Sequence, residues 1–115
     1  MTTVYKVLSN TAWLAAQELG EFRGSELDLR DGYMHFSTAD QLAETLARHY
    51  AGVADLVLLF VRIDAIQPSS AWRWEPSRGG ALFPHLYAPL PLSAVHQTEK
   101  LTLQAGGHQL PNLPR

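Results

Sequence analysis

A short, unbroken apolar segment most constrains how this chain can fold. Six consecutive residues carry no polar side chain: Leu56, Val57, Leu58, Leu59, Phe60 and Val61. The run is far shorter than the ~20 residues of a membrane-spanning helix and is rich in residues that favour strands. A strand that is apolar on both of its faces has to be covered on both. The sequence therefore predicts a central strand over 56–61, buried on both sides.

The composition excludes several functional classes. The chain has 115 residues, of which 46% are hydrophobic, enough for one core and too few for two ordinary domains. A formal net charge of −2 provides no basic surface for nucleic acid, so that partner is not expected. The chain contains no cysteine, and we see neither a leader nor a membrane segment. We expect a cytoplasmic protein without membrane contact, and the sequence leaves its oligomeric state open.

Helical and extended patterns follow each other along the chain. Apolar spacing predicts helices over 11–19, ended by Gly20, and over 39–50. Strand formers predict extended segments at 4–8 and, towards the end, 94–103. Two helices in the N-terminal half followed mainly by strands indicate an α+β domain with a mixed or antiparallel sheet. We expect this single domain to span 1–104, followed by a poorly ordered tail over 105–115.

The segment 31–41 concentrates polar groups at a predicted strand-to-helix junction. Asp31-Gly32 is a turn dipeptide, and in the strand after it His35 and Ser37 share one face. Thr38 and Gln41 have the spacing of a capping box at the start of the next helix. A helix N-terminus favours anionic ligands. These residues therefore form either a helix cap alone or part of a binding site.

Further polar and aromatic residues near predicted strand ends complete a candidate site: Glu75, Phe83, His85 and Tyr87. Two imidazoles with a carboxylate suit acid–base chemistry, with His35, Glu75 and His85 in the catalytic roles. The same three residues also form the donor set of a two-histidine, one-carboxylate metal site. A structural reading stays open beside both, with Glu75 paired to a neighbouring arginine and the aromatic rings in the core. No P-loop, dinucleotide-binding glycine motif or nucleophile elbow is present.

Several separated segments together resemble the bacterial family known as domain of unknown function 952. They are Val4-Tyr5-Lys6-Val7, Trp13-Leu14-Ala15-Ala16 with Gly20, Asp31-Gly32-Tyr33-Met34-His35-Phe36-Ser37-Thr38, Gln41, the strand 56–64, Trp74-Glu75 and Phe83-Pro84-His85-Leu86-Tyr87. The resemblance covers roughly residues 3–97. It implies remote kinship with the ADP-ribosyltransferase superfamily, which includes RNA 2′-phosphotransferases, and hence a split, bent sheet with a cleft that binds NAD.

The resemblance also implies roles for individual residues. Glu75 would stabilise an oxocarbenium-like ribose, while His35 and Ser37 would hold ribose or phosphate. His85 and Tyr87 would line the cleft, and Lys6, which stands where related transferases carry histidine, would bind a phosphate. The implied function is binding of NAD or a related nucleotide, with transfer of ADP-ribose or action on a phosphorylated ribose.

Two other functions compete with this one. In the first, the same residues maintain the fold of a non-catalytic interaction module that meets its partner through Trp72 or Trp74. In the second, His35, His85 and Glu75 bind a metal and the protein is a metal-dependent enzyme.

Overall fold

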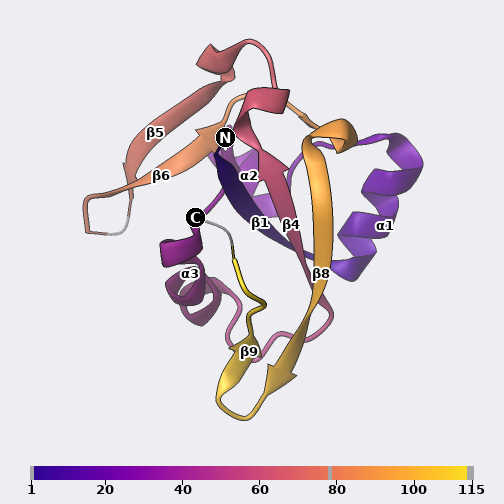
Figure 1. Cartoon of the computed structure of the whole chain (residues 1–115), viewed down its shortest axis with the longest axis vertical. Coiled ribbons are helices and arrows are strands. Elements are labelled where there is room, and N and C mark those ends of the chain that lie inside the picture. The colour runs from indigo at the N-terminus through magenta and orange to yellow at the C-terminus, as the bar shows by residue number, and fades with distance from the viewer. Residues whose placement is uncertain (1, 78, 114–115) are drawn as a thin grey trace.

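A four-stranded antiparallel sheet forms the centre of the computed structural model, which describes residues 2–77 and 79–113 (Figure 1). Its strands are β1 (Thr3–Ser9), β4 (Leu56–Arg62), β8 (Val95–Gln104) and β9 (Gly107–Gln109), in the order β1-β4-β8-β9. β4 pairs with both β1 and β8, and every residue from Leu56 to Val61 is at most 3% exposed. The predicted central strand is confirmed.

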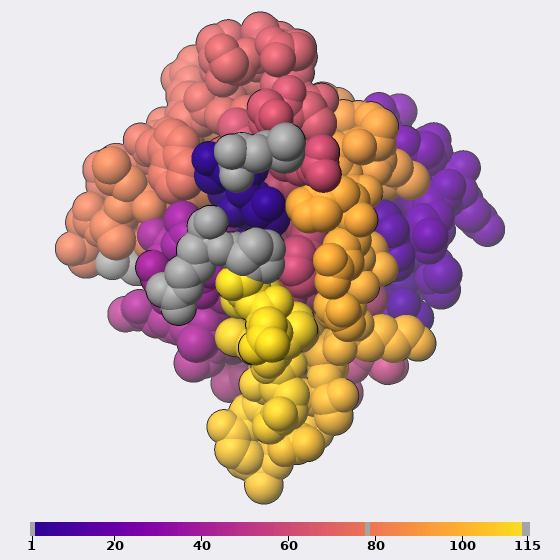
Figure 2. All heavy atoms as spheres, viewed as in Figure 1, coloured from indigo at the N-terminus to yellow at the C-terminus, as the bar shows by residue number. Residues whose placement is uncertain are grey.

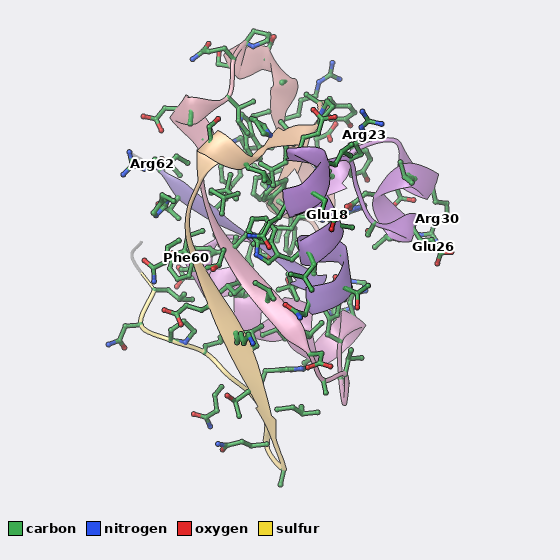
Figure 3. The ribbon with its side chains drawn as sticks, turned by 90° about the vertical axis from the view of Figure 1, so that its right-hand side faces the viewer. Glu18, Arg23, Glu26, Arg30, Phe60 and Arg62 are labelled. Atoms are coloured by element: carbon green, nitrogen blue, oxygen red, sulfur yellow. The ribbon has the colours of Figure 1, made fainter. Side chains whose placement is uncertain are left out.

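The two faces of β4 support two different apolar clusters. Val57, Leu59 and Val61 pack in the cluster that includes α1 (Asn10–Leu19), whereas Leu56, Leu58 and Phe60 pack in the one that includes α3 (Leu42–His49). This division follows from the alternation of side chains along a strand. Figure 1 shows α1 and α3 on opposite sides of the central strands, and in Figure 3 α1, with Glu18, lies across the face nearest the viewer.

A second, three-stranded sheet adjoins the edge of the first. It contains β3 (Met34–His35), β6 (Ala81–Leu86) and β5 (Trp72–Ser77), all antiparallel, in the order β3-β6-β5. Tyr5 of β1 and Ser37 join the two sheets by exchanging backbone hydrogen bonds of 2.8 and 2.9 Å. A short pair, β2 (Glu21–Phe22) with β7 (Leu90–Pro91), completes an α+β fold with a curled antiparallel sheet.

The N-terminal half contains three α-helices, so the expectation of two was wrong. The additional helix is α2 (Glu26–Asp31), in a segment of mixed polarity where apolar spacing predicted no helix. Ser25 and Asp28 form a capping box at its start, and Gly32, at φ 85°, ends it in the left-handed conformation. None of the helices among the described residues is long and apolar enough to cross a membrane.

Two predicted element boundaries also differ from the structure. The helix expected over 39–50 begins as a 3₁₀ turn at Ala39–Gln41, and only Leu42–His49 is α-helical. In the segment 105–115, expected to be a poorly ordered tail, β9 pairs with the end of β8, and Leu110 and Leu113 pack against the α3 cluster. Strand pairing and apolar contacts thus tie residues 107–113 to the rest of the protein, and β9 lies beside β8 in Figure 2. Residues 114 and 115 lie outside the described residues.

Candidate functional site

A cavity of about 230 Å³ lies where β1, α2, β3, α3 and β6 meet. Five of the residues singled out in the sequence line it: Lys6, His35, Ser37, Phe83 and His85. The other four, Thr38, Gln41, Glu75 and Tyr87, are not part of its wall. The two imidazoles do converge, since the ring centroids of His35 and His85 are 5.5 Å apart with the rings edge to face. They meet because His35 of β3 is paired directly with His85 of β6.

His35 is held between two carboxylates. Its Nδ1 lies 2.7 Å from Oδ1 of Asp28, and its Nε2 lies 2.9 Å from Oδ2 of Asp31. A neutral imidazole donates from one nitrogen only, so both contacts are hydrogen bonds when the ring is doubly protonated. Both ring nitrogens of His35 thus contact carboxylates of the protein. His35 therefore holds the cavity wall in position.

Lys6 and Asp28 form a buried ion pair beneath the cavity. Both residues are less than 5% exposed, and Lys6 Nζ lies 2.9 Å from Oδ2 and 3.1 Å from Oδ1 of Asp28. The ammonium group also donates to the carbonyl oxygen of His35 at 2.8 Å, so its three N–H groups are matched by three oxygens. Burial lowers the pKa of Lys6, and the charge of Asp28 opposes that shift.

Asp28 is the most heavily engaged group of the site. Besides Lys6 and the His35 ring it accepts hydrogen bonds from the backbone N–H of Ser25 at 2.8 Å and of His35 at 3.1 Å. Burial alone would raise the pKa of Asp28, but the hydrogen bond from His35, the charge of Lys6 and the Ser25 N–H outweigh it and hold that pKa well below its usual range. Asp28 therefore stays ionised and fixes β1, α2 and β3 relative to each other.

His85 is supported by a carboxylate of its own. Its Nδ1 lies 2.8 Å from Oε1 of Glu75, and the hydroxyl of Tyr87 donates to the same oxygen at 2.7 Å. These hydrogen bonds, that of Tyr87 first, lower the pKa of Glu75. His85 is 2% exposed, whereas Glu75 lies behind it and outside the cavity wall. Glu75 thus contacts the cavity through the ring of His85.

Tyr33 forms an aromatic wall beside both imidazoles. Its ring stacks on His85 with centroids 4.2 Å apart and lies 4.8 Å from His35 and 5.2 Å from Tyr87. Tyr5, Tyr50 and Phe83 contribute further rings to the lining. The cavity consequently combines apolar ring faces with hydroxyl and imidazole groups.

The remaining predicted ligand contacts serve the local structure. Ser37 is buried, and its hydroxyl is 2.8 Å from that of Thr45. The capping box is confirmed: Oε1 of Gln41 accepts a hydrogen bond from the Thr38 N–H at 3.0 Å. The Gln41 side-chain amide also donates to the Leu82 carbonyl oxygen at 2.8 Å, which ties the helix start to the β5–β6 hairpin.

Sequence reasoning did not identify Asp28, Tyr33 or Tyr50 as parts of the site. For Asp28 a signal was present, because Ser25 and Asp28 have the spacing of a capping box and mark a helix start. For Tyr33 the alternation with His35 placed it on the same face, without indicating a stack on His85. Nothing in the local pattern indicates that Tyr50, at the end of α3, reaches the cavity and donates to the Val7 carbonyl oxygen at 3.2 Å.

The structure bears on the two competing interpretations as well. Among the described residues, no group of three or more histidine and acidic side chains is placed to hold a metal ion, so the metal-dependent reading gains no support. Trp72 packs against Phe36 in the core and is 7% exposed, which removes it from any partner surface. Trp74, on the protruding β5–β6 hairpin, is 44% exposed.

Comparisons with known proteins give a family but no activity. A family model described as "Protein of unknown function (DUF952)" matches residues 7–98. The crystal structure of protein CC0527 from Caulobacter crescentus is 46% identical, covers 94% of both chains and has a TM-score of 0.88. A solution NMR structure of CC0527 is 47% identical, covers 94% of this chain and 91% of that one, and has a TM-score of 0.81. No curated protein matches the chain.

Proposed function

The chain belongs to the DUF952 family of proteins of unknown function, and we propose that its cavity binds the nucleoside part of NAD or of a related nucleotide. The observation that carries this proposal is the wall itself, in which the stacked ring of Tyr33 stands beside two imidazoles. Aromatic rings bind nucleobases by stacking, and hydroxyl and imidazole groups bind the polar edges of a sugar or base. The resemblance to the ADP-ribosyltransferase superfamily supports the same ligand class.

The charges of the wall favour an uncharged moiety. The lysine and arginine of the described lining, Lys6 and Arg30, are each paired with an aspartate, at 2.9 and 3.2 Å. Figure 3 shows Arg30 beside Glu26 on α2, at the edge of the molecule. A phosphate placed inside would have to compete with Asp28 for the buried ammonium group of Lys6 and with Asp31 for Nε of Arg30. The phosphates of the proposed ligand therefore lie outside the cavity, and Lys6 serves the fold.

The volume of the cavity also favours binding of only the nucleoside part of a nucleotide. At about 230 Å³ it is smaller than the ~300–1,000 Å³ of sites that enclose a whole drug-sized ligand. It suits one nucleoside rather than an entire dinucleotide. The resemblance gives Glu75 the role of stabilising the ribose during transfer of ADP-ribose, but Glu75 does not line the cavity and contacts it through His85. Binding, rather than transfer, is the function that the geometry supports best.

Calorimetric titration of the protein with NAD, ADP-ribose and adenosine tests the proposal. We expect saturable binding, which Tyr33→Ala weakens about 5- to 150-fold because base–aromatic stacking is worth ~1–3 kcal/mol. Tyr33→Phe keeps the ring and is the matched control, expected to bind nearly as the wild type does. The absence of binding for all three ligands would refute the proposal.

The same titration addresses the competing function of a non-catalytic interaction module. Such a module would use Trp74 and Leu82, which lie on the same face of the β5–β6 hairpin and are 44% and 52% exposed. Trp74 does not line the cavity, so we expect Trp74→Ala to leave nucleotide binding unchanged. Loss of nucleotide binding in Trp74→Ala with full binding in Tyr33→Ala would place the ligand on the hairpin instead.

A further inference from the structure

The two ring nitrogens of His85 differ in their surroundings. Its Nδ1 is bonded to Glu75, and within the described residues the structure gives no hydrogen-bond partner for Nε2. Among those residues, the one enclosed side-chain nitrogen or oxygen without a partner is Nε1 of Trp72. His85 Nε2 is therefore not sealed in the protein, although the residue is only 2% exposed. Because His85 lines the cavity, Nε2 is open to the cavity.

The hydrogen bond to Glu75 determines what this nitrogen can do. A carboxylate only accepts hydrogen bonds, so the proton of a neutral His85 ring resides on Nδ1. Nε2 is then left with a lone pair and acts as an acceptor. Tyr87 holds the carboxylate oxygen from the other side at 2.7 Å, and Tyr33 stacks on the ring at 4.2 Å. The orientation of the ring and the position of its proton are thus both determined by the protein.

The neighbouring imidazole is arranged in the opposite way. Both nitrogens of His35 lie against carboxylate oxygens, at 2.7 and 2.9 Å, and have no acceptor left for a ligand. Of these two imidazoles, His85 is the one that keeps an acceptor nitrogen for a ligand. An acceptor enclosed among rings selects a ligand that brings a donor, since a buried polar atom left unpaired costs free energy.

We propose that Nε2 of His85 accepts a hydrogen bond from a ribose hydroxyl of the bound nucleoside, with Glu75 as the positioning residue. This inference rests on the proposed nucleoside site and makes it specific for ribonucleosides. A ribose hydroxyl supplies a donor to Nε2, whereas a sugar without that hydroxyl leaves Nε2 unpaired. The loss of one neutral hydrogen bond corresponds to a weakening of about 2- to 10-fold.

The first part of the test is made on the protein without ligand. Nitrogen-15 NMR of the histidine rings at neutral pH reports which nitrogen of a neutral ring carries the proton. We expect His85 to carry it on Nδ1, with Nε2 unprotonated. In Glu75→Gln the side-chain amide can donate as well as accept, so we expect the proton to be shared between both nitrogens. Tyr87→Phe keeps the carboxylate and should keep the wild-type tautomer. A proton on Nε2 in the neutral wild-type ring would overturn the inference.

The second part compares adenosine with 2′,3′-dideoxyadenosine, which lacks both ring hydroxyls. We expect adenosine to shift the Nε2 signal of His85 and to bind about 2- to 10-fold more tightly than the dideoxy compound. His96→Gln, on the exposed strand β8, is the control and should preserve that preference. Equal binding of both compounds, with Nε2 unmoved, would overturn the inference while the nucleoside site stands. If neither compound binds, and NAD and ADP-ribose do not bind either, the proposed function itself is refuted, and the tautomer result still shows whether His85 is held as described.

Discussion

Removing the charge of Asp28 provides the most demanding test of the structural reasoning. Asp28→Asn keeps the shape of the side chain but leaves the ammonium group of Lys6, 4% exposed, without an anion. It also replaces one acceptor oxygen by a donor in a group that now accepts from Lys6, from Ser25 and twice from His35. Breaking a buried ion pair by removing one partner costs about 3–5 kcal/mol, a large share of the ~5–15 kcal/mol that stabilises a domain.

Urea unfolding measures this cost through the midpoint at constant slope. We expect Asp28→Asn to lose about 3–5 kcal/mol, and Lys6→Met combined with Asp28→Asn to recover part of that loss, because the uncompensated cation is gone. Asp31→Asn, at Nε2 of His35, is the control and should move the midpoint much less, because the Asp31 side chain is 28% exposed. A loss below about 1 kcal/mol in Asp28→Asn, or a double variant no more stable than that single one, would refute the reasoning.

The same variant predicts a change in the pH dependence of stability. The pKa of Asp28 is lower in the folded protein than in the unfolded chain. Its contribution is therefore complete above the ordinary aspartate pKa and is lost as the pH falls from there towards the folded pKa. Asp28→Asn should flatten the loss of stability on the acid side. Parallel acid profiles for wild type and variant would contradict this assignment.

Two further predictions concern the core and the carboxylate behind His85. Phe60→Ala should lower the free energy of unfolding in urea by about 3–5 kcal/mol, because the ring is 1% exposed and lies edge to face with Tyr5 at 5.1 Å. A loss below about 1 kcal/mol would show that the α3 side of the sheet is not tightly packed. Tyr87→Phe should raise the pKa of Glu75 towards its ordinary value, since the Tyr87 hydroxyl contributes first to its lowering. Carbon-13 NMR of the Glu75 carboxyl against pH measures this, and an unchanged midpoint would exclude the hydrogen bond.

The local sequence pattern predicted a structural element correctly where the residues of that element alone determine its structure. The unbroken apolar run 56–61 predicted the central strand, because a strand with two apolar faces is stable only when both are covered. Gly20 ended the first helix as expected, in the left-handed conformation at φ 93°. The spacing of Thr38 and Gln41 predicted a cap that the structure confirms. In each case the physical cause acts within a few residues of the chain.

Contacts between residues far apart in the sequence determine how the side chains of the candidate site are paired. Lys6 and Asp28 are 22 residues apart, and His85 and Glu75 belong to paired strands, so no local pattern indicates which carboxylate holds which cation or imidazole. The sequence by itself predicted the buried central strand and the α+β class. It also indicated which polar and aromatic residues lie near strand ends, where a site can form. Only the tertiary structure showed that Lys6 forms a buried ion pair with Asp28 and that Nδ1 of His85 is bonded to Glu75. The reason is that the ionisation of a side chain depends on its burial and on its charged or hydrogen-bonding neighbours. Both of these depend on which strands lie next to each other in the fold.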